Sequence, residues 1–521
     1  MVTIPEMLSR NARMYPDDCA LVELKPSLNY RREMTWRQMD EEANRVANAL
    51  IEMGVKRSDR VIMWMMNSID WLIVYFGILR SGAWVVPLNF RFTAGDFLYC
   101  TEISGARYMI IGEEFIERVD TVKKQFSEVE GILAFGERMP GYMAAYQSWI
   151  NRRPTSCPHV DISRDDACSL YFTSGTTGTP KPILLTHDNL RCAAVTEYAH
   201  HRQEKSDNFV LIPPLYHTGS KMHWFGSLIT GGRATLLGEV NPHNILETVS
   251  RERGTIVWLL VPWAHDILVA LEDGRIKKED YDLSCWRLMH IGAQPVPPSL
   301  IKRWMAAFPG MQYDTNYGLS EASGPGCVHL GVENVHKVGA IGKAGFNWET
   351  KIVAENGEMQ GAGKIGELLV RGEGVMKEYY KNPEKTAEAL CDGWLHTGDM
   401  ANMDKDGFIF LVDRKKDVII TGGENIFPVE VEDAIHNLDS VNDVAVIGIP
   451  DQRLGEIAIA IVDRKPGANV NKEEIIKYCM DNLARHKVPR KVIFGKVPRN
   501  PTGKIEKPGL REKYKPLNSA G

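Results

Sequence analysis

The stretch Tyr171-Phe172-Thr173-Ser174-Gly175-Thr176-Thr177-Gly178-Thr179-Pro180-Lys181 carries the strongest signal in this sequence. Apolar residues lead the chain from a predicted strand, Ser169 to Thr173, into a loop of glycines and hydroxyls that ends in one lysine. Glycines let backbone N–H groups approach an anion, hydroxyls add donors, and the lysine supplies charge. The stretch therefore predicts a polyphosphate-binding loop between a buried strand and a helix. The alternative is a solvated Ser/Thr/Gly linker, which is rarely found in that position.

The loop is not of the Walker type, because the pattern Gly-x-x-x-x-Gly-Lys-Ser/Thr does not occur in the chain. Gly503-Lys504 comes nearest to it, but Pro498 stands where the first glycine is required. The spacing therefore argues against a P-loop kinase.

Composition limits the class of protein and its partners. With 521 residues the chain is too long for one ordinary core, so two or more domains are expected. It is 44% hydrophobic and 25% charged, with a net charge of −5, as in soluble globular proteins. This balance gives no broad basic field that would hold nucleic acid or an anionic membrane. A phosphate site must therefore depend on a few placed cations and backbone amides.

Nine scattered cysteines without a Cys-x-x-Cys pair indicate reduced thiols in a cytoplasmic protein, with neither a disulfide framework nor a zinc site. The first residues have no basic or apolar leader pattern, so no signal peptide is expected. The most apolar stretch, Trp71 to Leu79, is far short of the ~20 residues that span a bilayer, and we predict a buried helix there. The sequence does not decide between a monomer and a homodimer.

Short strand and helix patterns alternate along most of the chain, which predicts an α/β fold with layered, mostly parallel sheets. The dipeptides Asn356-Gly357 and Asp406-Gly407 are typical of hairpin turns and predict a small β-barrel-like subdomain at about 339–413. A second α/β pattern follows it.

These patterns predict a large N-terminal domain over residues 1–413 and a small α/β domain over 417–521, with the boundary at 414–416.

The opening loop resembles the signature loop of the adenylate-forming superfamily, which includes acyl-CoA synthetases, the adenylation domains of peptide synthetases, and luciferases. Further motifs similar to those of this superfamily follow in its order: Asn316-Tyr317-Gly318-Leu319-Ser320-Glu321, Gly366-Glu367-Leu368, Trp394 to Asp399, Asp413 to Asp417, Gly422 to Ile426, and Pro498 to Lys504. The resemblance implies an AMP-dependent CoA ligase that uses ATP and Mg²⁺. Such an enzyme joins a carboxylic acid to AMP with release of pyrophosphate, and then passes the acyl group to a thiol with release of AMP.

The resemblance also implies residue roles. Glu321 is the Mg²⁺ ligand, a role suited to a carboxylate oxygen. Lys504 is a mobile lysine that bridges the carboxylate and the α-phosphate, and Lys181 and His217 complete the catalytic set. The implied nucleotide contacts are Thr173, Ser174, Gly175, Thr176, Thr177 and Gly178 at the phosphates, Gly292, Ala293, Gln294, Asn316, Tyr317, Gly318 and Ser320 around the adenine, and Asp399 and Arg414 on the ribose.

The resemblance further implies a hinge at 414–416, with a mobile C-terminal domain that moves about Lys416 for the second half-reaction. After rotation, Gly422, Gly423 and Glu424 line the tunnel for the pantetheine arm, because glycines leave that wall open. A plain hairpin turn is the alternative for this segment. Coenzyme A is the expected acceptor, since no carrier domain follows in the sequence. Its phosphates would meet Lys487, although a solvated basic helix end accounts equally for a lysine there.

One departure from the superfamily pattern is Pro182, where glycine usually follows the loop lysine. Proline fixes φ and removes an N–H, so we expect a functional loop with altered mobility.

The identity of the acid is the open question. Leu215 to Gly219 resembles the start of the acyl pocket in acyl-CoA synthetases, and it lacks the Asp that holds the ammonium of amino acid substrates. His217 is a gate residue, a polar pocket wall or a core histidine. His217 and His223 lack a third partner at metal-ligand spacing, so a metal site is not expected. The predicted pocket residues are Tyr216, His217, Trp263 and Gly318. Trp263 and Trp224 either shorten the cavity or are ordinary core residues.

These residues favour an aromatic, alicyclic or short-to-medium-chain acid. The alternatives are a long-chain fatty acyl-CoA synthetase, an adenylate-forming enzyme that loads a carrier protein, and a non-catalytic acyl or nucleotide sensor.

Overall fold

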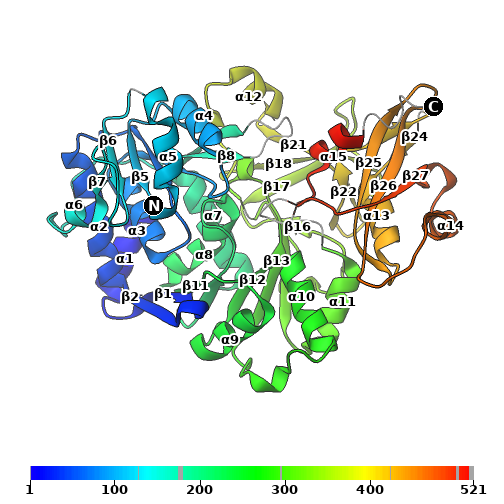
Figure 1. The fold of residues 1–521 in the computed structure, drawn as a ribbon, viewed down its shortest axis with the longest axis horizontal. Helices are drawn as coiled ribbons and strands as arrows, with labels where there is room; N and C mark the ends of the chain where they lie inside the picture. The colour runs from blue at the N-terminus through cyan, green and yellow to red at the C-terminus, as the bar shows by residue number, and fades with distance from the viewer. Residues whose placement is uncertain are drawn as a thin grey trace.

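The protein is described by a computed structural model that covers residues 2–126, 128–173, 180–293, 296–324, 326–422, 424–499 and 504–514. Figure 1 shows the N-terminal part (blue to green) and the C-terminal strands and helices (orange to red) at opposite ends of the molecule. The helices are α1 (Ile4–Met14), α2 (Trp36–Glu52), α3 (Ile69–Arg80), α4 (Ala94–Ser104), α5 (Ile116–Val122), α6 (Tyr146–Ile150), α7 (His187–His201), α8 (Thr218–Thr230), α9 (Pro242–Glu252), α10 (Val261–Glu272), α11 (Pro298–Ala307), α12 (Pro383–Ala389), α13 (Pro428–His436), α14 (Lys472–Asn482) and α15 (Lys507–Tyr514).

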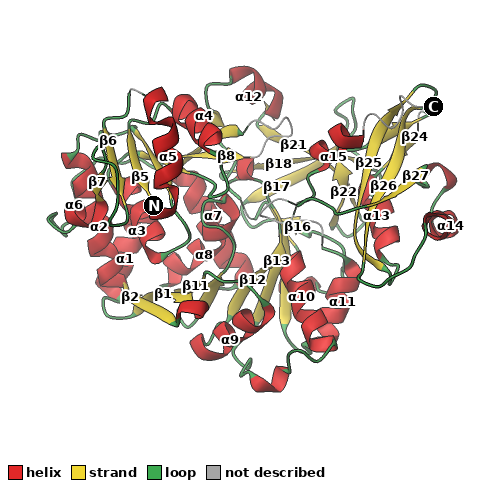
Figure 2. Cartoon of the chain, viewed as in Figure 1, coloured by secondary structure: helices red, strands yellow, loops and turns green. Residues whose placement is uncertain are grey.

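Two large sheets form the N-terminal part, and helices pack against both (Figure 2). The first has the strand order β16 (Lys343–Ala344), β15 (Val328–His329), β14 (Gln312–Tyr317), β13 (Leu288–Gly292), β12 (Ile256–Leu260), β10 (Asn208–Leu211), β11 (Arg233–Leu237), β1 (Cys19–Lys25) and β2 (Tyr30–Thr35). The second has the order β19 (Glu378–Tyr379), β9 (Lys181–Thr186), β8 (Ala167–Thr173), β4 (Trp84–Pro87), β3 (Arg60–Trp64), β5 (Tyr108–Ile111), β6 (Gly131–Ala134) and β7 (Ala144–Ala145).

Most neighbouring strands of both sheets run parallel, from β1 through β14 in one and from β8 through β7 in the other. One continuous core cluster contains residues from both sheets and from the helices between them. The layered α/β prediction is confirmed. In such sheets ligands bind at the carboxyl ends of the strands, and β8, β13 and β14 end at Thr173, Gly292 and Tyr317.

Local signals place the helices of this core. The Thr35 hydroxyl accepts the Gln38 N–H in the capping box that begins α2. Helix α3 is buried along its whole length, as predicted for a helix that is apolar on every face. At Gly77 a Cβ would stand 2.4 Å from the Cβ of Val46, so only glycine lets α3 approach α2 this closely. Among the described helices, none has the length and apolarity to cross a bilayer.

One local expectation was wrong. The chain does not pass from the phosphate loop into a helix, because strand β9 intervenes before α7. The run Ile183-Leu184-Leu185 is short, apolar and buried, as in a sheet core, and Pro182 disfavours a helix. Pro182 sits near the start of β9, where its carbonyl accepts the Tyr380 N–H at 2.9 Å. A missing N–H is tolerated there because the position lies at the end of the ladder.

A third, antiparallel sheet follows and confirms the predicted β-rich subdomain. It consists of β17 (Trp348–Val353), β18 (Gly366–Gly372), β21 (Trp394–Met403), β20 (Leu390–Cys391) and β22 (Ile409–Arg414). Asp406-Gly407 forms the turn between β21 and β22, as its sequence predicts. The same hairpin brings Asp399 opposite Arg414.

The C-terminal part has its own sheet and core. Its strands are β24 (Glu424–Ile426), β23 (Ile419–Thr421), β26 (Gly455–Arg464), β25 (Val441–Asp451) and β27 (Lys491–Phe494). Two hydrophobic clusters cover this sheet, one of them including α13 and α14 and the other including α15. The short segment between Arg414, which ends β22, and Ile419, which begins β23, therefore links the third sheet to the C-terminal sheet along the chain. The exact domain boundary at 414–416 stays a prediction.

Candidate active site

Three strands from two sheets meet at a buried carboxylate. Asp399 on β21 is 4% exposed, and the Nε atom of Arg414 on β22 lies 2.7 Å from its Oδ1. The hydroxyl of Tyr317, the last residue of β14, donates to Asp399 Oδ2. Burial raises the pKa of Asp399, while the Arg414 guanidinium opposes that shift. Asp399 therefore contacts both Arg414, which is also expected at the ribose, and Tyr317, which is expected at the adenine.

A second cluster surrounds Glu321, which lies in a short 3-10 helix, Ser320–Ala322. The hydroxyl of Tyr379 on β19 donates to Glu321 Oε1 at 2.8 Å. The Nζ atom of Lys181 lies 5.4 Å from the centre of the Tyr379 ring. Tyr379 thus contacts both Lys181 and Glu321, the residue expected to bind Mg²⁺. Sequence reasoning missed Tyr379 because it comes from an isolated two-residue strand.

The donor set at this cluster fits magnesium. Mg²⁺ prefers oxygen ligands and is held in proteins by one or two carboxylates together with substrate phosphates. Glu321 supplies such a carboxylate, fixed by Tyr379, and Lys181 lies beside it as a cation for the phosphates.

The C-terminal domain delivers Lys504 to these groups. Lys504 interacts electrostatically with Asp399, Glu321 and Arg414, and also with His217. It retains solvent contact, yet desolvation among these groups lowers its pKa to about 8. Arg414 lowers the pKa further, whereas the two carboxylates oppose the shift. The role of Lys504 in adenylate formation stays a prediction.

The lowered pKa of Lys504 predicts an alkaline limb in the pH profile. If the protonated lysine is required, kcat/KM for ATP falls as the pH rises through about 8, because the cation is lost above that value. Arginine stays protonated over this range, so Lys504→Arg is expected to retain less activity but to lack the limb. A profile of wild-type enzyme that stays flat up to pH 9.5 would contradict the assignment.

His217 stands at the start of α8. Its Nδ1 accepts the Gly219 N–H at 3.3 Å, which leaves the proton of the neutral ring on Nε2. Burial lowers the pKa of His217 to about 3, and Lys504 and Lys221 act in the same direction. His217 is therefore neutral at physiological pH and offers an N–H donor.

The other predicted pocket residues differ in their surroundings. The Tyr216 ring packs edge-on against Phe90 with ring centres 5.4 Å apart. The Ser320 hydroxyl lies 3.0 Å from that of Thr218, so the adenine-side turn contacts the start of α8. Trp263 is half-buried on α10, whereas Trp224 is fully buried in the helical core.

Lys221 is a further residue that sequence reasoning missed. It is fully buried on α8, and its Nζ donates to the carbonyls of Leu215 at 3.2 Å and His217 at 3.3 Å. Its Nζ also lies 4.6 Å from the Tyr171 ring centre. Burial keeps the pKa of Lys221 well below its usual value. Lys221 therefore fastens the His217 segment to the core.

The segment between the domains is tied on both sides. Lys415 pairs with Glu367 at 3.0 Å, and the buried Asp413 accepts the Val429 N–H at 2.9 Å. Lys416, the expected hinge residue, has its pKa lowered by burial. The hinge role itself stays a prediction.

The residues expected to meet coenzyme A lie on the C-terminal domain. Gly422 has φ +58° and lies at the turn between β23 and β24, so a hairpin turn is present. Lys487 Nζ donates to both carboxylate oxygens of Glu430, each at 2.7 Å. In this arrangement Lys487 is engaged by its own domain.

Several predicted contacts lie outside the described residues: Ser174, Gly175, Thr176, Thr177, Gly178, Gln294 and Gly423. Their neighbours are described. Thr173 ends β8, Lys181 begins β9, and Ala293 has φ +69°, a conformation that costs energy for an L-residue and is common at ligand sites. Asn316 and Gly292 lie beside each other at the ends of β14 and β13.

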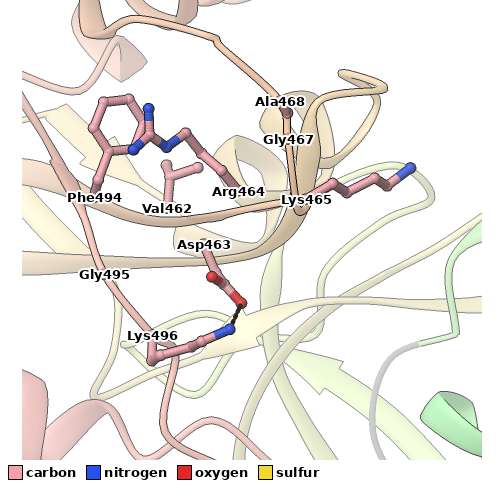
Figure 3. A pocket seen from close by; sticks show the side chains of 9 residues that line it. All are labelled: Val462, Asp463, Arg464, Lys465, Gly467, Ala468, Phe494, Gly495 and Lys496. Carbon is pink, nitrogen blue, oxygen red and sulfur yellow. Dashed lines mark hydrogen bonds and ion pairs between the residues drawn. The ribbon is translucent and has the colours of Figure 1, made fainter.

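A groove of about 420 Å³ opens elsewhere, on the C-terminal domain beside β26 and β27 (Figure 3). It contains the Asp463–Lys496 ion pair at 3.0 Å and the Arg464 guanidinium over the Phe494 ring at 4.3 Å. None of the residues discussed above lines it, and we assign it no catalytic role.

Comparisons with known proteins agree with this geometry. The profile described as AMP-binding enzyme matches residues 8–380, and the one described as AMP-binding enzyme C-terminal domain matches residues 430–504. The chain is 32% identical to the long-chain-fatty-acid–CoA ligase FadD13 of Mycobacterium tuberculosis, covering 99% of both chains. It is 33% identical to feruloyl-CoA synthase of Amycolatopsis sp, covering 97% of this chain and 98% of that one. The crystal structure of the anthranilate CoA ligase AuaEII in complex with anthranoyl-AMP matches with a TM-score of 0.89 and 28% identity, over 99% of this chain and 98% of that one.

Proposed function

This chain belongs to the family of AMP-binding enzymes, and from that premise we propose how its residues divide the reaction and which acids it takes. It is an AMP-forming acid–thiol ligase. The observation that carries the assignment of roles is the convergence of Asp399, Glu321 and Lys504, which come from three separate segments, on one site.

In the first half-reaction a carboxylate oxygen attacks the α-phosphorus of ATP. A bond forms between that oxygen and phosphorus, and the bond to pyrophosphate breaks. Asp399 orients the ribose by accepting hydrogen bonds from its hydroxyls, and Lys504 neutralises the approaching anions. Mg²⁺, held by Glu321, would neutralise charge on the phosphates.

In the second half-reaction the sulfur of coenzyme A attacks the acyl carbonyl, and AMP leaves with the electron pair of the broken C–O bond. Lys504 must leave the site to make room for the thiol. Rotation about Lys416 removes it and brings the Gly422–Glu424 turn towards the acyl group.

The acyl pocket supports an aromatic, alicyclic or short-to-medium-chain acid. We place this pocket beside Tyr216 and His217, where Tyr216 packs against Phe90 and the neutral His217 can donate one hydrogen bond. The similarity to feruloyl-CoA synthase and to an anthranilate CoA ligase supports aromatic acids. The similarity to a long-chain-fatty-acid–CoA ligase makes fatty acids the second candidate.

Ligand-dependent melting separates the two candidates. Benzoates and cyclohexane carboxylates, added with ATP, are expected to raise the melting temperature, because a ligand that binds the folded state stabilises it by mass action. Palmitate is expected to have little effect. Stabilisation by palmitate alone would transfer the assignment to long-chain acids.

A panel of carboxylic acids tests the reaction itself. With ATP and coenzyme A, pyrophosphate, AMP and an acyl-CoA are expected in equal amounts. Production of ADP and phosphate would contradict an adenylate intermediate. Exchange of pyrophosphate into ATP that requires the acid but not coenzyme A would show that the adenylate forms before the thiol binds.

A further inference from the structure

Among the described residues, five histidines and two acids gather in the core next to the adenine side of the site: Glu197, His200 and His201 on α7, His223 on α8, His290 on β13, Asp314 on β14, and His329 on β15. The Nδ2 atom of Asn316 lies 3.0 Å from His223 Nε2 and 3.5 Å from Glu197 Oε1, which connects the group to the nucleotide site. The reaction described above uses none of these seven side chains.

The centre of the group is one oxygen faced by three imidazole nitrogens. Asp314 Oδ2 lies 3.1 Å from His329 Nδ1, 3.3 Å from His201 Nε2 and 3.7 Å from His290 Nδ1. His201 Nε2 and His290 Nδ1 are 3.1 Å apart. All four side chains are fully buried, with 0% exposure. The other oxygen of Asp314 accepts the Gly331 N–H at 2.9 Å, so the carboxylate is held in place.

A second carboxylate lies on the other side of two of these rings. Glu197 Oε2 is 3.2 Å from His201 Nδ1, and Glu197 Oε1 is 3.3 Å from His329 Nε2. Each ring therefore lies between two carboxylates. A neutral imidazole has one N–H, so it can donate to only one of them, and its bare nitrogen then faces the other anion. Either each ring takes a second proton, or a cation lies between the bare nitrogens and Asp314.

Hydrogen bonding within the group is incomplete. Glu197 Oε2, His201 Nδ1, His290 Nε2 and His329 Nε2 are buried and lack a hydrogen-bond partner of suitable geometry among the described residues. Buried polar atoms are usually paired, so hydrogen bonds alone do not satisfy this group. None of these four atoms is one that faces Asp314, so they lie outside the set of nitrogens turned towards that carboxylate.

We propose that His201, His329 and Asp314 bind a divalent transition-metal ion, for which Zn²⁺ is the best fit. His290 Nδ1, 3.1 Å from His201 Nε2 and 3.7 Å from Asp314 Oδ2, is the fourth ligand. Bonds of about 2.0–2.1 Å to a tetrahedral zinc ion place neighbouring ligand atoms roughly 3.3–3.4 Å apart. The contacts between these atoms, 3.1–3.7 Å, lie on either side of that separation. Three imidazoles and one carboxylate also suit Zn²⁺ better than Mg²⁺ or Ca²⁺, which are bound by oxygen ligands.

Charge and orientation support the same site. Asp314 and Glu197 bring two negative charges into a fully buried region, and one divalent ion balances them. Glu197 stands where a carboxylate orients the non-ligating nitrogens of His201 and His329, an arrangement common around protein-bound zinc. The ion would join α7 to β13, β14 and β15, the strands that carry Gly292 and Tyr317. It would act as a structural support for the adenine side, independent of the ligase reaction.

Metal analysis of the purified full-length enzyme tests the proposal. After exposure to Zn²⁺ and removal of loosely bound ions, about one equivalent of zinc per chain is expected. Chelation in the absence of nucleotide is expected to lower the melting temperature by a few degrees, and Zn²⁺ but not Mg²⁺ restores it. Enzyme loaded with Co²⁺ is expected to show the visible absorption bands of a tetrahedral site.

Variants locate the ion. His329→Gln and Asp314→Asn are expected to lose the metal and the Co²⁺ bands. His187→Gln is the matched control, since His187 is equally buried at the other end of the same helix and lies outside the group. Wild-type enzyme that binds no stoichiometric Zn²⁺ and melts unchanged in chelator would overturn the proposal and leave a network held by imidazolium protons. Retention of metal by both site variants would overturn the location.

Discussion

Lys504→Ala is expected to slow acyl-adenylate formation by about 10²–10³-fold, the usual loss when one placed group that stabilises transition-state charge is removed. Lys504 is the cation that the C-terminal domain contributes beside Asp399 and Glu321. Two anions, the carboxylate and the α-phosphate, must meet there, and negative charge builds on the leaving pyrophosphate. The measurement is acid-dependent pyrophosphate exchange into ATP.

The same variant is expected to convert supplied acyl-AMP and coenzyme A to the thioester at nearly the wild-type rate, because Lys504 has left the site in that step. Lys496→Ala is the control, since Lys496 is a lysine of the same domain with a side chain 87% exposed. An equal loss in both half-reactions would count against the alternation of the C-terminal domain.

Asp399→Asn is expected to raise the KM for ATP by roughly 30- to 100-fold. The substitution removes the partner of Arg414 at a buried position and weakens the acceptor for the ribose hydroxyls. A hydrogen bond to a charged group contributes about 1.5–3 kcal/mol, which sets the expected change in KM. The free energy of unfolding also falls, by less than the roughly 3–5 kcal/mol of a fully buried pair, because the Arg414 side chain is 42% exposed.

Steady-state kinetics and nucleotide binding measure this effect, and a fall in melting temperature is expected as well. Asp404→Asn serves as the control. Asp404 lies in the turn that follows β21, outside the nucleotide site, and forms an ion pair with Lys337. An unchanged KM for ATP in Asp399→Asn would contradict the assignment of the ribose hydroxyls to Asp399.

Sequence patterns predicted the fold well where local and tertiary preferences agree. The uniformly apolar α3 and the Asp406-Gly407 turn both occur as expected. The helix expected after the phosphate loop does not, because the apolar run Ile183 to Leu185 pairs with β8 instead. A short apolar run does not distinguish a strand from a helix by its periodicity.

The motifs also predicted which charged residues gather at the site, since Asp399, Arg414 and Lys504 all occur within them. Supporting residues carried no such signal. Tyr379 and Lys221 act through contacts that only the assembled fold creates. The histidine group was overlooked for the same reason. Its members come from positions 197 to 329 on separate elements, so no spacing in the sequence marks them. The scattered cysteines and the pair His217 and His223 predict no zinc site, whereas the proposed site takes its ligands from positions far apart in the sequence.

A crystal structure with Mg²⁺ and a non-hydrolysable ATP analogue tests the central claim most directly. The expected result has the ribose hydroxyls on the Asp399 carboxylate, the triphosphate along residues 173–181, and Mg²⁺ on Glu321. A nucleotide bound elsewhere, or these three positions closed by protein side chains while the analogue is present, would contradict the account.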